Sequence, residues 1–322
     1  MFAFNLFLSV TTYFLIMSAM SSHFTTGRQL FYKEIMRLIA ITILCCLLVA
    51  MGLTHAGADQ KAGNAASKSA DEWQKLADGL ELGIFASPQP AEIGDSKIRI
   101  LRIDPGRYEL KLLNASVSKK GRPLSAKQWC RQNGLVAAIN ASMYQEDFKT
   151  SVSYMRTRTH VNNPRLREKD MTILAFDRLG TGVPEVKIID RQCEDFRFWK
   201  NKYGSLVQSI RMISCTGKNV WRQQAKKYST VAIGIDTADR VLLIHVGSPY
   251  STHDLINILK TLPLQIARAM YTEGGPQAQL YIKTGAQEYE FVGHSEIDLS
   301  NNTNSLFSWP IPNVIGISLR KD

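Results

Sequence analysis

The chain has 322 residues, of which 45% are hydrophobic and 21% are charged, a globular composition that excludes a disordered or fibrous chain. The net charge of +11 arises from basic residues spread along the chain and mixed with acids. This diffuse excess favours an anionic partner, such as an envelope polymer, a phosphate-bearing substrate or a membrane surface. Because no recognition motif with interleaved aromatic residues occurs, we expect no nucleic-acid partner.

The amino-terminal part of the chain has the pattern of an export signal. Met36-Arg37 precedes LIAITILCCLLVAMGLTHAGA, an apolar segment that ends in small residues. A charged start, a hydrophobic stretch and an Ala-Gly-Ala ending are typical of a secretory signal peptide. We therefore predict cleavage after Ala58, or alternatively after Ala56, and a periplasmic or secreted protein. Met36 is favoured as the true start; if residues 1–35 are translated and retained, a membrane-anchored protein is the alternative.

Three regions follow from this pattern. Residues 1–58 are the upstream segment and signal peptide. Residues 59–80 are a small, polar linker and a short helix, which the capping-box spacing of Ser69 and Glu72 predicts. Residues 81–322 are the functional domain.

Short strands outnumber helices in the functional domain. Strands are predicted in chain order at 96–105, 108–116, 135–140, 171–177, 185–190, 205–214, 229–236, 240–247, 269–275, 278–283 and 312–320. Helices are predicted after Ser125, at 194–203, and at 254–262 with Ser251 or Thr252 as N-cap. Because turns rather than crossover helices join most neighbouring strands, we predict a single α+β domain on a mixed, largely antiparallel sheet.

The cysteines beyond the signal peptide are Cys130, Cys193 and Cys215. An odd count in an exported chain suggests one disulfide and one free thiol. Cys193 and Cys215 are the closest pair and each flanks an ordered element, so this bridge is favoured, with other pairings open. Their spacing is not that of a metal site, so no structural zinc is expected.

Two strand ends carry polar groups beside small residues. The strand at 135–140 ends in Asn140, and Glu273 directly precedes Gly274, Gly275 and Pro276. One interpretation is a tight turn with a polar edge. The other is a ligand site on a rigid sheet, where glycine lets the backbone approach the ligand closely.

Five motifs in a fixed order resemble the phosphodiester glycosidase family over residues 96–320. They are AAINASMY, QSIRMI, VAIGID, the Ser251-Thr252-His253-Asp254 helix start and YTEGGPQAQLYI. The resemblance implies a hydrolase that cleaves a glycosyl phosphodiester, or a related envelope polysaccharide, at the glycosidic carbon. It implies a carbohydrate or sugar-phosphate ligand. A non-catalytic carbohydrate- or envelope-binding protein on the same fold is the alternative.

The resemblance also assigns positions. The family's site positions match Asn140, Glu273, Gly274 and Gly275. This chain departs from the family pattern at four positions. Glu273 stands where the family has an aspartate, Pro276 where it has a glycine, Gln277 where it has a serine, and Thr230 where it has an arginine. Losing that arginine removes a fixed cation from a phosphate site. The resemblance therefore supports the family's fold more strongly than the family's substrate.

Cleavage at the glycosidic carbon passes through an oxocarbenium-like transition state, which a carboxylate must stabilise or attack. Glu273 is the predicted nucleophile or base. A phosphodiester is a good leaving group, so holding its charge matters more than protonating it. We expect the N–H of Gly275 and the amide of Asn140 to hold the anion or a sugar hydroxyl. Alternatively, Asn140 only caps its strand end.

The proton-handling partner is predicted at the start of the helix at 254–262. His253, assisted by Asp254, would move the proton, although an ordinary helix residue is the alternative. Arg211 would replace the missing arginine as a phosphate clamp, unless it forms an ion pair on the sheet. His160, His245 and His294 are interpreted as structural or surface residues. Oxygen ligands near Glu273 leave room for calcium, although no dedicated calcium loop occurs.

Overall fold

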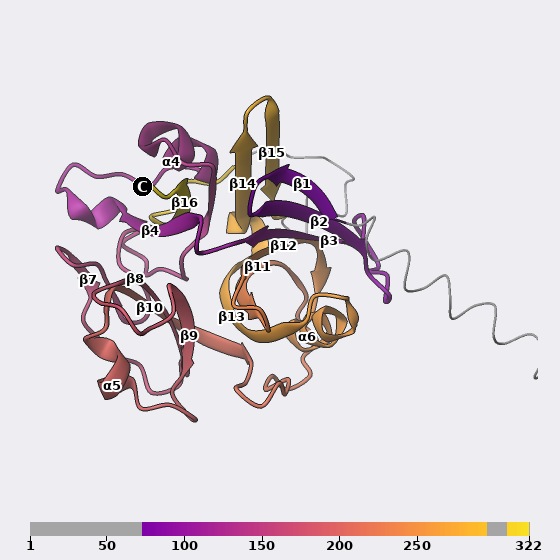
Figure 1. Ribbon diagram of the computed structural model, residues 1–322. Helices are drawn as coiled ribbons and strands as arrows, with labels where there is room; N and C mark the ends of the chain where they lie inside the picture. The colour runs from indigo at the N-terminus through magenta and orange to yellow at the C-terminus, as the bar shows by residue number, and fades with distance from the viewer. Residues whose placement is uncertain (1–72, 295–307, 322) are drawn as a thin grey trace, which may run out of the picture. The chain divides into compact units, whose positions relative to one another are not determined.

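The computed structural model describes residues 73–294 and 308–321 (Figure 1). All of them belong to one compact unit, Ser69–Asp322. The predicted signal peptide, its cleavage site and most of the linker lie outside the described residues. Within the described ranges, no helix is both long and apolar enough to span a membrane.

The strands form two sheets in which every pairing is antiparallel (Figure 1). The larger sheet runs in the order β1 (Trp73–Ala77), β2 (Leu80–Ala86), β3 (Lys97–Ile103), β12 (Val241–Tyr250), β11 (Tyr228–Asp236), β13 (Ile266–Gly274), β10 (Tyr203–Ile213), β6 (Met155–Arg156) and β7 (Val161–Asn163), with β8 (Thr172–Arg178) joining β10 to β9 (Val186–Asp190). The smaller sheet runs β15 (Gln287–Val292), β14 (Gln279–Thr284), β5 (Ala137–Asn140), β16 (Asn313–Leu319) and β4 (Tyr108–Asn114). The predicted α+β class is confirmed, although the strands are divided between two sheets.

The helices begin within two residues of the predicted positions. They are α4 (Ala126–Asn133), α5 (Phe196–Lys200) and α6 (Thr252–Thr261), together with the 3-10 turns η1 (Ala115–Val117) and η2 (Gly275–Gln277). Ser125 caps α4 in a reciprocal capping box with Gln128. Ser251 caps α6, because its hydroxyl accepts a hydrogen bond from the Asp254 N–H. Side-chain caps of this kind satisfy backbone donors that have no partner inside the helix.

The short helix predicted from Ser69 is wrong over its described part. Trp73–Ala77 forms strand β1, which pairs with β2 across the turn at Asp78 and Gly79. Gly79 has a φ of +73°, the left-handed conformation that a tight hairpin needs and glycine adopts readily. The local hairpin signal therefore overrides the capping-box spacing.

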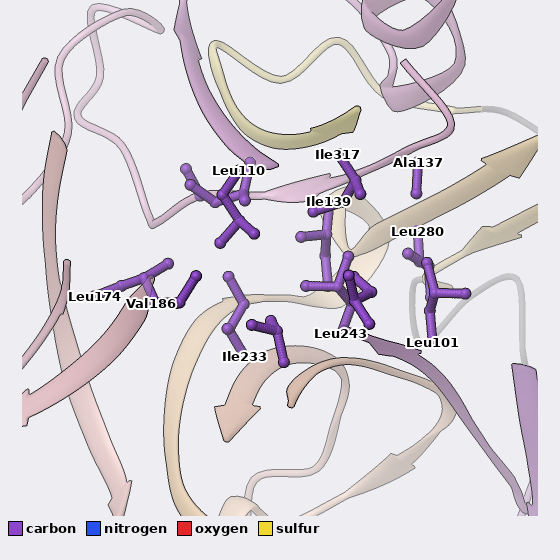
Figure 2. Packing of buried hydrophobic residues seen from close by; sticks show 14 of the residues in the cluster. Leu101, Leu110, Ala137, Ile139, Leu174, Val186, Ile233, Leu243, Leu280 and Ile317 are labelled. Carbon is purple, nitrogen blue, oxygen red and sulfur yellow. The ribbon is translucent and has the colours of Figure 1, made fainter. Parts of the chain in front are cut away.

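The main hydrophobic core lies between the two sheets (Figure 2). In Figure 2, Leu101, Ile233 and Leu243 of the larger sheet lie near Ile139 and Leu280 of the smaller one, and all belong to one buried cluster. Successive strand residues point to opposite faces, so the residues between those of the main core fill three outer cores. One outer core lies between the larger sheet and α6, and another between the smaller sheet and α4. A third lies where α5 packs against β8, β9 and β10.

The cysteines pair as the sequence favoured. Cys193 and Cys215 form a disulfide, and Cys130 is free and buried in α4. Burial raises the pKa of the Cys130 thiol to about 12, so this thiol stays protonated and unreactive at neutral pH.

Candidate functional site

Strand β13 is irregular directly before Glu273. Val231 of β11 lies opposite Glu273, whereas the next residue, Ala232, lies opposite Tyr271, so Thr272 is an extra residue in β13. This is a β-bulge, a feature that re-aims side chains and is common beside active sites. Regular alternation would place Tyr271 and Glu273 on the same face. Because of the bulge, Glu273 lies instead on the same face of the larger sheet as Val231. Val231 packs in the core between the sheets.

The carboxyl group of Glu273 is half-buried and carries no ion pair within the described part of the chain. Its Oε1 accepts a hydrogen bond from the Gly274 N–H at 3.0 Å. Burial raises the pKa of Glu273 to about 7, and the Gly274 N–H offsets this only in part. A carboxyl group that titrates near neutral pH can take or give a proton, as a general base or acid must.

Two tyrosines lie within electrostatic reach of Glu273. Burial and then the charge of Glu273 raise the pKa of Tyr144 to about 12. The same two causes, in the same order, raise the pKa of Tyr271. Tyr144 lies four residues beyond the end of β5. The charge of Glu273 therefore acts on a segment that leaves the smaller sheet.

Asn140 fixes the turn that leaves Glu273. Its Nδ2 donates to the Gln277 carbonyl at 2.9 Å, and its Oδ1 accepts from the Gln279 N–H at 2.8 Å. The side chain is 1% exposed. These bonds join β5 to the start of β14. They match the alternative interpretation from the sequence, in which Asn140 caps the end of its strand. Direct contact between Asn140 and a ligand stays a prediction.

The two glycines of the turn meet different steric demands. Gly275 has a φ of +68°, which favours glycine. Gly274 is extended, but a Cβ there would lie 2.1 Å from the Tyr271 hydroxyl and 3.2 Å from the Ser229 carbonyl. The turn therefore has no room for a side chain at Gly274, and the role of Gly275 in holding an anion stays a prediction.

We expect Gly274→Ala to destabilise the protein by roughly 1 to 3 kcal/mol, the usual cost of overpacking. Adding Tyr271→Phe should recover part of this loss, because it removes the hydroxyl that a Cβ would strike. Urea unfolding of the single and double variants measures both effects. Gly180→Ala is the matched control, since nothing lies within 4 Å of a Cβ there. Equal losses in the single and double variants would contradict the proposed clash.

His253 and Asp254 are not brought to Glu273. They lie in the first turn of α6, which packs against the opposite face of the larger sheet from Glu273. The Nδ1 of His253 lies 2.6 Å from the Trp221 carbonyl. The Asp254 carboxylate accepts from the Ser251 hydroxyl at 2.7 Å and from Gln223 at 2.8 Å. Both side chains thus hold local structure at the helix start.

Arg211 forms the ion pair that the sequence left as the alternative to a phosphate clamp. Its Nη1 lies 2.8 and 2.9 Å from the two carboxylate oxygens of Asp190. The Asp190 side chain is 0% exposed and also accepts from the Cys215 N–H at 2.9 Å. Arg211 is therefore already neutralised by a buried partner beside the disulfide.

Sequence reasoning set aside two histidines that lie on the Glu273 side of the larger sheet. His245 lies opposite Val231, in the same cross-strand row as Glu273. Burial, followed by the charge of Arg99, lowers the pKa of His245 to about 3. Within the described residues, both ring nitrogens of His245 and Nδ1 of His294 lack hydrogen-bond partners. From the sequence, the alternation of residues along β12 predicts only that His245 shares a face of the strand with apolar residues. It does not predict that His245 lies in the same row as Glu273.

Within the described part of the chain, Glu273 belongs to no group of acidic, histidine or cysteine side chains close enough to share a metal ion. Over residues 73–294 and 308–321, the one group of three acidic, histidine or cysteine side chains close enough to share a metal is Asp190, Cys193 and Cys215. The two cysteines are joined in a disulfide, so neither sulfur is a free thiolate. Calcium takes six to eight oxygen ligands, and Glu273 has no second carboxylate in such a group.

Comparison with known proteins gives a family match and two similar folds. A family model described as phosphodiester glycosidase matches residues 133–318. A hypothetical protein from Synechocystis aligns with a TM-score of 0.54 and 11% identity over 77% of this chain and 63% of that chain. The catalytic domain of zebrafish N-acetylglucosamine-1-phosphodiester alpha-N-acetylglucosaminidase, auto-inhibited by its pro-peptide, aligns with a TM-score of 0.50 and 12% identity over 77% of this chain and 86% of that chain. No curated protein matches.

Proposed function

We propose a function on the premise that the chain belongs to the phosphodiester glycosidase family, whose model matches residues 133–318. The protein hydrolyses a glycosyl phosphodiester, or a related envelope polysaccharide, at the glycosidic carbon. The observation that carries this proposal is Glu273, a half-buried carboxyl group with no ion pair among the described residues, which a β-bulge places on the face of β13 that borders the core between the sheets.

The proposed reaction adds water to the anomeric carbon and breaks its bond to the phosphate oxygen. The products are the free sugar and a phosphate monoester, which departs as a weak base and needs little protonation. Ionised Glu273 stabilises the positive charge that develops on the sugar and takes the proton from the attacking water. The N–H of Gly275 offers a donor for the phosphate or a sugar hydroxyl, whereas the Gly274 N–H already donates to Glu273.

The compartment is part of the proposal. The Cys193–Cys215 disulfide suits an oxidising compartment outside the cytoplasm. The predicted signal peptide would deliver the protein there. N-acetylglucosamine-1-phosphate diesters are the first substrates to test, because the zebrafish protein of similar fold acts on this class by its name.

The test is turnover of sugar-1-phosphate diesters by the purified protein between pH 5 and pH 9, with and without calcium. Because the ionised form of Glu273 is active and its pKa is about 7, kcat/KM should rise about tenfold per pH unit below 7 and level off above it. Glu273→Gln should release no sugar. Glu92→Gln, at a side chain that is 80% exposed, is the matched control and should match the parent.

Turnover that survives Glu273→Gln would overturn the assignment of this residue. No turnover of any diester by the parent would favour the non-catalytic binding protein instead. In that case a sugar-1-phosphate diester should bind the parent and Glu273→Gln with equal affinity, as isothermal titration would show.

A further inference from the structure

Helix α5 packs only two of its three aromatic side chains against the rest of the protein. Phe196 and Trp199 are three residues apart, so they share one face of the helix, and both pack on the outer core beside β8, β9 and β10 (Figure 1). Phe198 lies between them in the sequence, and its side chain is 58% exposed. Its one aromatic contact among the described residues is an edge contact with Trp199. The inner face of α5 is therefore filled without Phe198.

A second exposed apolar side chain, Leu179, belongs to the turn that follows β8. Its side chain is 49% exposed, and its backbone N–H donates to the Lys202 carbonyl at 2.9 Å. The ammonium group of Lys202 lies 4.3 Å from the centroid of the Phe198 ring. The turn after β8 and the end of α5 are thus neighbours, and each exposes a large apolar side chain. Single exposed apolar residues are ordinary, whereas neighbouring ones with a charged rim indicate an interaction surface.

The charged rim of this surface is basic. Arg197 and Lys200 are exposed and Lys202 is half-buried, and none of the three forms an ion pair within the described ranges. Residues 195–202 contain these three cations and one acidic residue, Asp195. The Asp195 carboxylate is engaged as the cap of α5, where it accepts from the Arg197 N–H at 2.9 Å. The surface therefore carries an excess of positive charge that the protein itself does not neutralise.

We propose that this surface docks on a membrane that contains anionic lipids. We call it the α5 patch, and it consists of Leu179, Arg197, Phe198, Lys200 and Lys202. The two apolar side chains enter the boundary between the lipid headgroups and the acyl chains, and the three cations contact lipid phosphates. Apolar side chains combined with Lys and Arg are the pattern by which a protein binds the surface of an anionic membrane. Long basic side chains keep their charged ends among the headgroups while their stems cover apolar surface.

The apolar part of the α5 patch favours a lipid surface over an anionic polysaccharide. A sugar packs its C–H face on a flat aromatic ring, but Leu179 has no ring and Lys202 already lies over the ring of Phe198. An aliphatic side chain gains free energy by leaving water. A bilayer offers an apolar environment for this transfer, whereas a hydrated polysaccharide chain does not. Membrane docking through α5 depends neither on the proposed hydrolysis nor on the apolar amino-terminal segments.

The test is co-sedimentation of the predicted mature protein, residues 59–322, which contains the whole compact unit and lacks the apolar amino-terminal segments. The vesicles are phosphatidylglycerol and phosphatidylcholine in equal parts, or phosphatidylcholine alone. The parent should sediment with the anionic vesicles only, and less so as salt rises. Phe198→Ala should weaken this binding about fivefold, because less apolar area leaves water. Arg197→Gln combined with Lys200→Gln should weaken it about twentyfold, since each basic residue near an anionic surface contributes about fivefold.

Matched controls separate the α5 patch from exposure and charge in general. Phe148→Ala removes a ring that is also 58% exposed, outside the α5 patch, and should leave vesicle binding unchanged. Lys260→Gln removes an exposed lysine on α6 and should change binding less than about twofold, as one distant charge is screened by salt. Phe198→Leu keeps an apolar side chain and should retain most of the binding. Melting temperatures of all variants show whether the fold is intact.

Each outcome decides the proposal. A parent that does not sediment with anionic vesicles overturns it, as does binding that the Phe198 and double basic variants leave unchanged. Retention of the parent on immobilised polygalacturonate, without vesicle binding, would assign the α5 patch to an anionic polysaccharide instead. Equal binding to neutral and anionic vesicles would remove the role of the cations and also contradict it. Glu273→Gln should bind vesicles as the parent does, so membrane docking and hydrolysis can stand or fail separately.

Discussion

Replacing Glu273 with glutamine should stop hydrolysis and at the same time stabilise the fold at pH 8. The pKa of Glu273 is about 7 in the folded protein against an ordinary value of 4.5. Between these values the folded state holds a proton that the unfolded state releases. The free energy of unfolding therefore falls as pH rises from about 4.5 to about 7, and stays lower above that range. Glutamine carries no charge and avoids this loss.

The expected gain is about 1 to 2 kcal/mol at pH 8. The full pKa difference would correspond to about 3 kcal/mol as a ceiling, and partial solvation of the half-buried carboxyl group reduces it. Urea unfolding of parent and variant at pH 4.5 and pH 8 measures the effect. The two proteins should be nearly equal at pH 4.5, where the parent is largely protonated, and should separate at pH 8. A variant that is less stable than the parent at pH 8 would contradict the proposed environment of Glu273.

A control variant distinguishes this effect from a general change in charge. Glu92→Gln removes an exposed carboxylate that pairs with Lys227, so it should not gain stability with rising pH. A gain confined to Glu273→Gln, together with loss of turnover, is the pattern of a residue retained for chemistry at a cost in stability. A turn residue without chemistry would give no reason to keep a buried acid there.

Local patterns in the sequence were sufficient to predict most elements of the fold. The hairpin of β11 and β12 follows from two apolar runs joined by a short polar turn, and α6 follows from its cap and its apolar period. These signals depend on neighbours in the chain. Glu273 was singled out in the same way, from its place before two glycines.

Local sequence patterns could not predict that the strands divide into two sheets. Strands β13 and β14 are separated only by η2, yet they lie in different sheets. The β-bulge at Thr272 depends on pairing with β11, and the bonds from Asn140 to Gln277 and Gln279 cross more than a hundred residues. The sequence could therefore single out Glu273 and Asn140 as candidates but could not show that His253 lies on the opposite face of the larger sheet, because a strand face is decided by long-range pairing.

Long-range pairing also gives Arg211 its partner Asp190, and it predicts a large effect of changing that partner. Asp190→Ala should destabilise the protein by about 3 to 5 kcal/mol, because it leaves a buried guanidinium without its counter-charge. Arg211 is 13% exposed, and its Nε already lacks a hydrogen-bond partner among the described residues. The Cys215 N–H would lose its acceptor as well. Urea unfolding at pH 7 measures the loss.

A double variant then separates an ion pair from a phosphate clamp. Asp190→Ala combined with Arg211→Met removes both charges, so it should recover much of the stability lost in the single variant. If Arg211 serves only Asp190, the double variant should also keep the parent's KM for a sugar-1-phosphate diester. A stable double variant with a much higher KM would instead show that Arg211 reaches the phosphate despite its pairing. Failure of the double variant to recover stability would mean that Asp190 acts mainly through the Cys215 backbone and the neighbouring disulfide.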